Sequence, residues 1–148
     1  MQKLNFPTYS FRLKNRENKL LIFDQIRKKF VVLQPEEWVR QHCVEFLINE
    51  KKYPKSLINV EKEMSINDVK KRYDIVVYNS DGSIFLIVEC KSFKIKITQD
   101  TFDQVARYNL ALNAEYLMTT NGINHYYCTL DYKKQAYQFL KEIPNYKS

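Results

Sequence analysis

The sequence predicts a single α/β domain in which a mixed central sheet is flanked by helices and preceded by a small N-terminal β-meander. Two observations support this prediction. Along the chain, the apolar pattern changes from short β-prone runs to a helix, then to strands, a second helix and a further strand. The chain also has only two glycines, in "NSDGSI" and "TTNGIN", and Asp-Gly or Asn-Gly between apolar runs is typical of a β-hairpin.

The first half of the chain is expected to form the meander and one helix. Residues 9–33 alternate short β-prone runs with charged turns, which favours strands joined by tight connections. In "PEEWVRQHCVEFLINEKKY", Pro35 suits a first helical turn and two glutamates follow it. Apolar residues then recur with helical spacing, at positions 39, 43, 46 and 47.

The second half is expected to supply most of the central sheet. Strands are predicted at residues 57–63, 72–79 and 84–91. A second amphipathic helix follows in "TQDTFDQVARYNLALN", with Thr98 as its N-cap, before a strand at residues 115–120. After Asn121 and Gly122 the chain returns as "NHYYCTL", and "QAYQFLKEI" closes it.

Composition restricts the class of protein and the kind of partner. The 148 residues suffice for one domain, and no stretch approaches the roughly 18 apolar residues of a membrane span. The N-terminus lacks the apolar core of a secretion signal, so a cytoplasmic protein with no membrane partner is expected. The three cysteines lack a CxxC spacing and are interpreted as reduced, mostly buried thiols. Lys and Arg number 24 against 17 Asp and Glu, a net charge of +7 that favours a polyanionic partner such as nucleic acid.

Charged residues end the most apolar run of the chain, "IFLIVECKSF". If Asp81 and Gly82 form a two-residue turn, residues facing each other across the hairpin have numbers that sum to 163, and Asp74 faces Glu89. Strand alternation then puts Asp74, Glu89 and Lys91 on one face. The same alternation adds Phe85 and Ile87 to that face, and it puts Ile84, Leu86, Val88 and Cys90 on the other.

Two carboxylates at facing strand positions repel each other, so something positive must offset them. Two interpretations stay open. Lys91 alone forms a salt bridge at the end of the sheet, or the pair binds a hard divalent cation such as Mg²⁺, which takes one or two carboxylates together with water and phosphate oxygens. In the second case Lys91 orients the attacking water or stabilises charge on a phosphate.

The stretch "RYDIVVYNSDGSIFLIVECK" resembles the D…ExK signature of the PD-(D/E)xK nucleases, and more closely the N-terminal nuclease domain of type I restriction enzyme R subunits. Flanking elements share the resemblance: "PEEWVRQHCVEFLINEKKYP" is similar to the first helix, "FDQVARYN" to a QxxxY element, and "YLMTTNGINHYYC" to the strand-turn-strand. The resemblance implies a restriction-endonuclease-like fold with its core at residues 35–128. Residues 1–34 are then a β extension and residues 129–148 a C-terminal extension of the same domain.

The resemblance also implies a set of site residues. Asp74 and Glu89 become metal ligands, with the Cys90 carbonyl as a third, and Lys91 becomes the catalytic lysine. Gln104 and Tyr108, four residues apart on one helix face, support the site and approach the DNA backbone. A glutamate of the first helix completes it; Glu36 and Glu37 both qualify, Glu37 being chosen, and the alternative is that both merely favour the helix N-terminus.

The predicted function is therefore an Mg²⁺-dependent endodeoxyribonuclease, with Mn²⁺ able to substitute for Mg²⁺. Its partners are DNA and, in a split system, other restriction-modification subunits. The sequence has no GxxxxGK[ST] phosphate loop, so this chain carries no translocating motor of its own. The alternative is a non-catalytic nucleic-acid-binding or assembly module on the same fold. His42 and His125 fit no metal-ligand spacing and are expected in core or surface roles.

Overall fold

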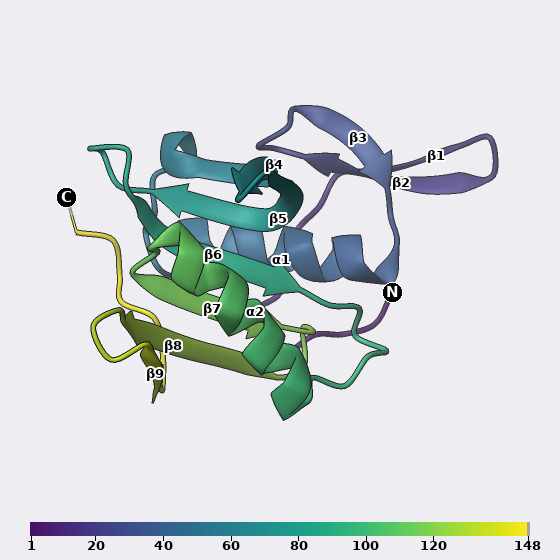
Figure 1. Ribbon diagram of the computed structural model, residues 1–148. Helices are drawn as coiled ribbons and strands as arrows, with labels where there is room; N and C mark the ends of the chain where they lie inside the picture. The colour runs from purple at the N-terminus through teal and green to yellow at the C-terminus, as the bar shows by residue number, and fades with distance from the viewer. Residues whose placement is uncertain (148) are drawn as a thin grey trace.

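The computed structural model describes residues 1–147, which form two β-sheets and two α-helices (Figure 1). The elements in chain order are β1 Leu13–Arg16, β2 Lys19–Asp24, β3 Lys29–Val32, α1 Pro35–Asn49, the 3₁₀ turn η1 Lys55–Leu57, β4 Ile58–Ile66, β5 Val69–Tyr78, β6 Ile84–Cys90, α2 Gln99–Leu112, β7 Tyr116–Thr120, β8 His125–Asp131 and β9 Ala136–Leu140. The predicted mixed α/β fold with an N-terminal β-meander is confirmed.

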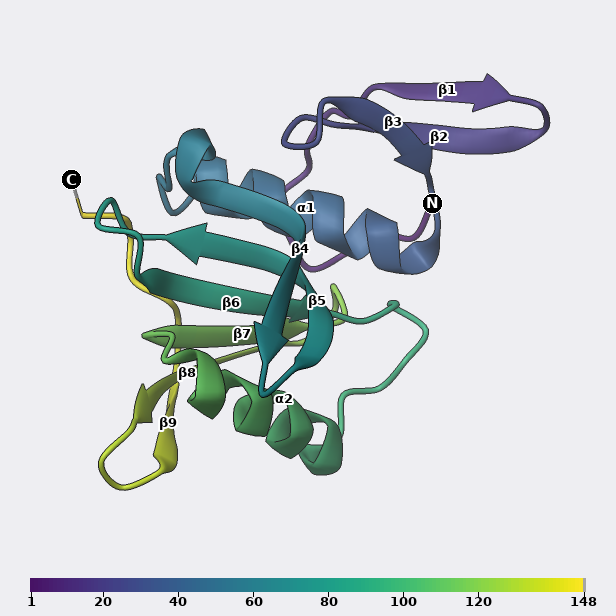
Figure 2. The same ribbon diagram turned by 45° about the horizontal axis from the view of Figure 1, so that its top comes forward.

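The central sheet has the order β4-β5-β6-β7-β8-β9. Strands β6 and β7 run parallel, and the other neighbouring pairs are antiparallel. A parallel pair needs a long crossover, which α2 supplies. Figure 2 shows α1 and α2 on opposite faces of the sheet, with the sheet of β1, β2 and β3 lying beyond α1. None of the helices in the described chain is long and apolar enough to span a membrane.

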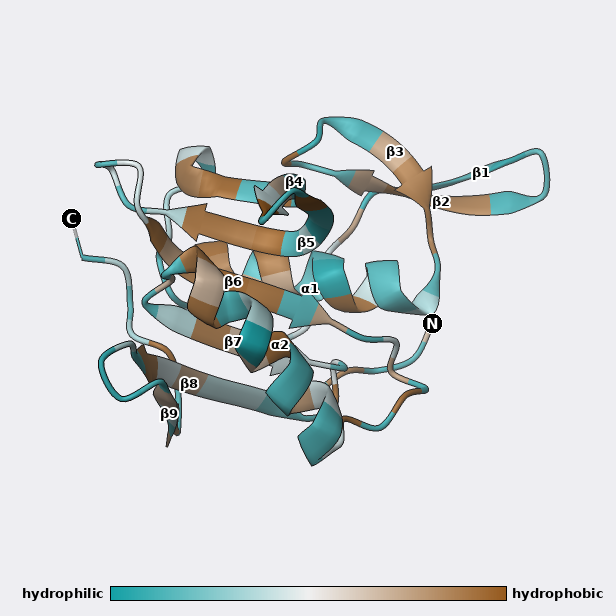
Figure 3. Cartoon of the chain, viewed as in Figure 1, coloured by the Kyte–Doolittle hydropathy of each residue, from teal (hydrophilic) through white to brown (hydrophobic). Residues whose placement is uncertain are grey.

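Two apolar layers hold the helices to the sheet. The α1 layer includes Val39, Cys43 and Leu47 of the helix, and the α2 layer includes Phe102 and Val105. Figure 3 shows that the central strands are the most hydrophobic part of the chain, because they are covered on both faces. The predicted N-cap of the second helix is confirmed, since the Thr98 hydroxyl accepts the backbone N–H of Thr101 at 3.2 Å.

The N-terminal segment covers the outer face of α1 with aromatic side chains. His42 lies in this cover, with its ring centroid 4.8 Å from Phe11 and 4.4 Å from Trp38. His125 packs 4.4 Å from Phe6. Both histidines therefore have the packing role expected of them, and burial lowers the pKa of each. The three cysteines are free and buried, as predicted.

The strands around the central hairpin differ from the prediction in length. The strands expected at residues 57–63 and 72–79 are parts of one long hairpin, β4–β5, which runs from Ile58 to Tyr78. Asn67 and Asp68 form its turn, each with positive φ, a conformation that Asn and Asp tolerate well. This extension carries the hairpin tip well beyond the apolar core. Strand β8 also crosses the expected boundary at residues 128 and 129, and the division of the chain into core and extensions stays a prediction.

The turn between β5 and β6 is longer than the predicted two residues. Tyr78 faces Ile84, so five residues lie between the strands, and Gly82, with φ of 90°, accommodates the turn. A β-bulge beyond this point adds one residue to β6 and restores the sum of 163, as in the pair Ile75 and Val88. The bulge also reverses two side chains. Phe85 packs in the α1 layer and Ile84 in the α2 layer, opposite to the strict alternation expected.

Candidate functional site

Four of the predicted site residues surround one hollow between the sheet and α2. The hollow has a volume of about 290 Å³ and contains Glu89 and Lys91 from the end of β6. Gln104 and Tyr108 line it from α2, where their spacing of four residues puts them on one helix face. Its full lining is Val69, Lys70, Lys71, Glu89, Lys91, Thr101, Gln104, Val105 and Tyr108. The structure thus brings the carboxylate, the lysine and the QxxxY pair together.

Glu89 is a buried acid that lacks a full set of partners. Its residue exposure is 7%, and its Oε1 atom has no hydrogen-bond partner. The nearest cation is the ammonium group of Lys71, whose Nζ lies 3.5 Å from Oε1. Burial, reinforced by the charge of Asp74, raises the pKa of Glu89 to about 7, although Lys71 and Lys91 act in the opposite direction. An additional positive charge beside this buried carboxylate would stabilise its ionised form.

Lys71 is a site residue that was not predicted from the sequence. Its Nζ lies 4.7 Å from the centroid of the Tyr73 ring and 4.1 Å from that of Tyr108, so the ammonium group contacts two aromatic faces and Glu89. Strand alternation alone would not have identified it, because strict alternation puts positions 71 and 73 on the face of Ile75, in the α1 layer, whereas Tyr73 packs in the α2 layer.

Asp74 precedes Ile75, which faces Val88, and its carboxylate is held toward α1. Its Oδ1 accepts a hydrogen bond from Nη2 of Arg40 at 2.7 Å, and its Oδ2 accepts the backbone N–H of Cys90 at 2.8 Å. Asp74 is still close enough to Glu89 to raise the pKa of that residue. The two carboxylates therefore lie on different sides of the sheet, Asp74 toward α1 and Glu89 toward α2, so the prediction that they share one face is wrong.

Arg40 organises the α1 side of the site and was not predicted. Its guanidinium is buried and contacts three carboxylates: Glu37 at 2.7 Å, Glu61 at 2.5 Å and Asp74 at 2.7 Å. Burial alone would lower the pKa of Arg40, but Glu37 and Asp74 together raise it above its usual value. Glu61 reaches Arg40 from β4, where its backbone adopts a φ of 57°. This left-handed conformation interrupts the strand beside Asp74.

The two candidate glutamates of the first helix have different surroundings. Glu37 is buried and accepts hydrogen bonds from Arg27 at 2.8 Å, from Arg40 at 2.7 Å and from Gln41 at 3.0 Å. The Glu36 side chain is half exposed. Burial and the charge of Asp74 raise the pKa of Glu36, while Arg40 and Lys91 oppose the rise. The charges of Asp74 and Lys91 therefore both affect the pKa of Glu36. The assignment of Glu37 as a ligand stays a prediction.

The remaining predicted ligand, Cys90, can offer only its backbone. Its side chain is 1% exposed and packs in the α1 layer, as the alternation of β6 predicts. Within residues 1–147, no three His, Cys, Asp or Glu side chains are grouped so as to hold a metal ion. Arg40 and Lys71 instead neutralise the acidic side chains at this end of the hairpin.

The raised pKa of Glu89 predicts that stability depends on pH. Because the folded-state pKa is about 7 and the ordinary value is 4.5, the folded protein binds this proton more tightly than the unfolded chain. The free energy of unfolding is then expected to fall as pH rises from about 4.5 to about 7, by up to about 3 kcal/mol. Glu89→Gln removes this cost, so urea unfolding with EDTA should show the variant more stable than the parent at pH 8.

At pH 5 the advantage of Glu89→Gln should shrink to below about 1 kcal/mol, because the parent is then largely protonated at Glu89. Glu63→Gln provides the control, since that side chain is 48% exposed. If Glu89→Gln were no more stable than the parent at pH 8, the conclusion that burial raises the pKa of Glu89 would be wrong.

The chain is similar to a known protein family and to a solved structure. The family model described as "Type I restriction enzyme R protein N terminus (HSDR_N)" matches residues 35–144, which is most of the chain. No curated protein sequence matches the chain. Among solved structures, a DUF820 protein from Anabaena variabilis ATCC 29413 is similar, with 14% identity and a TM-score of 0.47 over 88% of this chain and 76% of that one.

Proposed function

The chain belongs to the family of type I restriction enzyme R protein N-terminal domains, and on this premise we propose that it is a metal-dependent nuclease that hydrolyses phosphodiester bonds in DNA. The observation that carries the proposal is the grouping of Glu89, Lys91, Gln104 and Tyr108 around one hollow, with Asp74 near enough for its charge to raise the pKa of Glu89. A purely structural role would not need two buried acids at the end of one hairpin.

The donors at the end of the hairpin fit a hard divalent cation. Mg²⁺ binds carboxylate oxygens and keeps water or substrate oxygens in its other positions. Asp74 and Glu89 would hold it, with the Cys90 carbonyl as a further ligand, and Oε1 of Glu89, which has no hydrogen-bond partner, supports this fit. When bound, such an ion polarises the phosphate and lowers the pKa of a bound water.

The other residues have roles that follow from their place in the hollow. Lys91 keeps a positive charge beside Glu89, where it can stabilise negative charge on the phosphate. Arg40 holds Asp74 in place through the hydrogen bond to Oδ1. Glu36, rather than Glu37, would be the helix glutamate that contributes to the site, because its side chain is half exposed and the charge of Asp74 raises its pKa. Gln104 and Tyr108 form the α2 wall along which the DNA backbone passes.

One observation favours the second candidate function, a non-catalytic nucleic-acid-binding module. Arg40 and Lys71 already pair with the two acids, so the charges at this end of the hairpin are partly neutralised without a metal. In that case the basic residues around the hollow bind phosphates and no bond is broken. The partners of either form are DNA and, in a split restriction system, other restriction-modification subunits.

Cleavage assays with the full chain distinguish the two functions. Supercoiled, linear and single-stranded DNA are incubated with Mg²⁺, with Mn²⁺ and with EDTA. The nuclease predicts cleavage of at least one form with either metal and none with EDTA, because the ion supplies the Lewis acid. Binding without cleavage of any form under both metals would reject the nuclease in favour of the binding module.

A further inference from the structure

A second hollow continues the first one along the face of α2. It has a volume of about 480 Å³ and is lined by Ile66, Asn67, Val69, Lys71, Gln104, Arg107, Tyr108 and Ala111. Four of these residues, Val69, Lys71, Gln104 and Tyr108, also line the hollow at Glu89. The two hollows therefore form one groove, here named the hairpin–helix groove. Figure 2 shows its two walls, the tip of the β4–β5 hairpin and α2, side by side.

The groove combines exposed apolar surface with positive charge. Val69 is 60% exposed and Tyr108 is 39% exposed, and both line the two hollows. Lys70, Lys71, Lys91 and Arg107 supply the cations. The outer hollow has no acidic residue in its lining, and Glu89 lies at the inner end. This charge distribution is complementary to a phosphate chain whose path ends at the acids.

Aromatic faces beside cations are typical of sites for unpaired nucleic acid. A base stacks on the aromatic ring, and neighbouring cations bind the phosphates. The Tyr108 ring already has one cation over it, since Nζ of Lys71 lies 4.1 Å from its centroid. In a duplex the faces of the bases are stacked on one another, so an exposed ring in a walled groove can reach a base face only where the strand is unpaired.

We infer that the hairpin–helix groove binds one unpaired strand of DNA and leads it to Glu89, with a base stacked on Tyr108 and flanked by Val69. The inference rests on the proposed function for the direction of the path, and it adds the class of substrate: single strands, or duplexes with unpaired ends, rather than continuous duplex. Arg107, on the outer stretch of the groove, contacts a phosphate that is remote from Glu89.

Binding to fluorescent oligonucleotides in EDTA tests the inference without cleavage. The full chain is titrated against a 20-nucleotide single strand, its blunt duplex, and the same duplex with a single-stranded overhang. The single strand and the overhang are expected to bind about tenfold more tightly than the blunt duplex. Tyr108→Ala should weaken single-strand binding by about tenfold, whereas Tyr108→Phe, which keeps the ring, should bind as the parent does.

Two further variants test the groove with little risk to the fold, because both sites lie on its surface. Val69→Glu puts a negative charge beside the strand and should weaken single-strand binding by about tenfold or more. Arg107→Ala should lower the salt dependence of binding by about 0.7 in the slope of log K against log salt, the loss of one phosphate contact. Thermal unfolding checks that each variant folds as the parent does.

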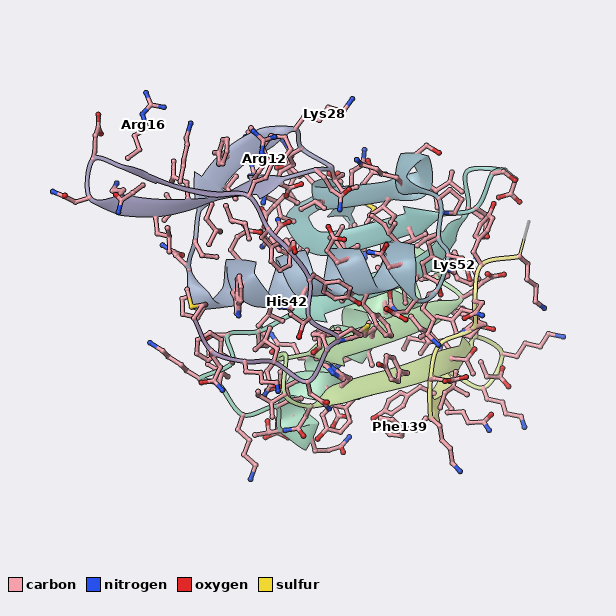
Figure 4. All side chains as sticks on the ribbon, turned by 180° about the vertical axis from the view of Figure 1, so that it is seen from behind. Arg12, Arg16, Lys28, His42, Lys52 and Phe139 are labelled. Carbon is pink, nitrogen blue, oxygen red and sulfur yellow. The ribbon has the colours of Figure 1, made fainter. Side chains whose placement is uncertain are left out.

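Matched controls lie on other parts of the molecule. Arg16 lies on the β1–β2 hairpin and Phe139 on β9, and both are labelled in Figure 4. Leu13, on β1, is 47% exposed and Phe139 is 50% exposed. Leu13→Glu, Arg16→Ala and Phe139→Ala should therefore leave single-strand binding unchanged. Loss of binding in these controls to the same degree as in the groove variants would overturn the assignment.

The outcomes separate this inference from the proposed function. Equal binding of blunt duplex and single strand, or parental binding by Val69→Glu and Tyr108→Ala, overturns the groove assignment even if the protein cleaves DNA. Selective loss of single-strand binding in the groove variants supports the assignment even if no DNA form is cleaved, and in that case it is the proposed catalysis that fails.

Discussion

Lys91→Ala is expected to reduce the rate of DNA cleavage by about 10² to 10³ while leaving DNA binding nearly intact. Lys91 lies beside Glu89 in the hollow, and its backbone N–H donates to the Thr120 carbonyl at 2.8 Å, so its position is fixed by the sheet. A protonated lysine cannot ligate a metal ion, and its contribution should therefore appear in turnover rather than in metal affinity. Single-turnover cleavage with saturating protein measures this effect.

Lys94→Ala is the matched control, because Lys94 is exposed on the loop after β6. Lys94→Ala should lower the affinity for DNA and reduce the salt dependence of binding. The rate at which bound DNA is cleaved should stay unchanged. If Lys91→Ala cleaved as fast as the parent, the lysine would have no role in the reaction.

Arg40→Met is expected to lower the free energy of unfolding by about 3 to 5 kcal/mol. The guanidinium is only 7% exposed and pairs with Glu37, Glu61 and Asp74, so the variant leaves buried carboxylates without their counter-charge. Methionine preserves the apolar part of the packing, and the loss therefore reports mainly on charge. Urea unfolding at neutral pH with EDTA measures it.

Arg72→Met is the control for this prediction. The Arg72 side chain is 66% exposed, and its ion pairs are long, 3.9 Å to Glu61 and 3.8 Å to Glu63. Its loss should cost at most about 1 kcal/mol. Mn²⁺ should raise the thermal midpoint of Arg40→Met by more than that of the parent, because a cation then replaces the missing charge. Parental stability of Arg40→Met would show that the carboxylates need no counter-charge.

The sequence was sufficient to locate the α2 side of the site. Strand alternation relates Glu89 to Lys91, and helical spacing relates Gln104 to Tyr108, so each pair could be placed on one face from its spacing alone. The register predicted for the hairpin is correct at Ile75 and Val88, but Asp74 and Glu89, one position further on, do not share a face as predicted, because Asp74 is turned toward Arg40. The turn has more residues than expected, and the bulge in β6 compensates for the difference before the site is reached.

The α1 side could not be predicted by the same rules. Arg40 is a buried charge on a helix, a position that amphipathic patterns assign to apolar residues, and its partner Asp74 is 34 positions away in the sequence. Glu61 joins it only because its backbone adopts a left-handed conformation within β4, which no local pattern marks. The hairpin–helix groove likewise depends on the length of β4 and β5 beyond their apolar portions.

The most direct test of the central claim, that Asp74 and Glu89 form a divalent-cation site for DNA hydrolysis, is the Mg²⁺ dependence of cleavage by the parent and by Glu89→Gln at equal DNA occupancy. The parent is expected to have no activity in EDTA and a rate that rises to saturation with Mg²⁺. The variant, folded and more stable than the parent at pH 8, should remain slower by at least about 10² at every Mg²⁺ concentration. A Glu89→Gln protein that cleaves DNA with the same Mg²⁺ dependence and rate as the parent would contradict the claim.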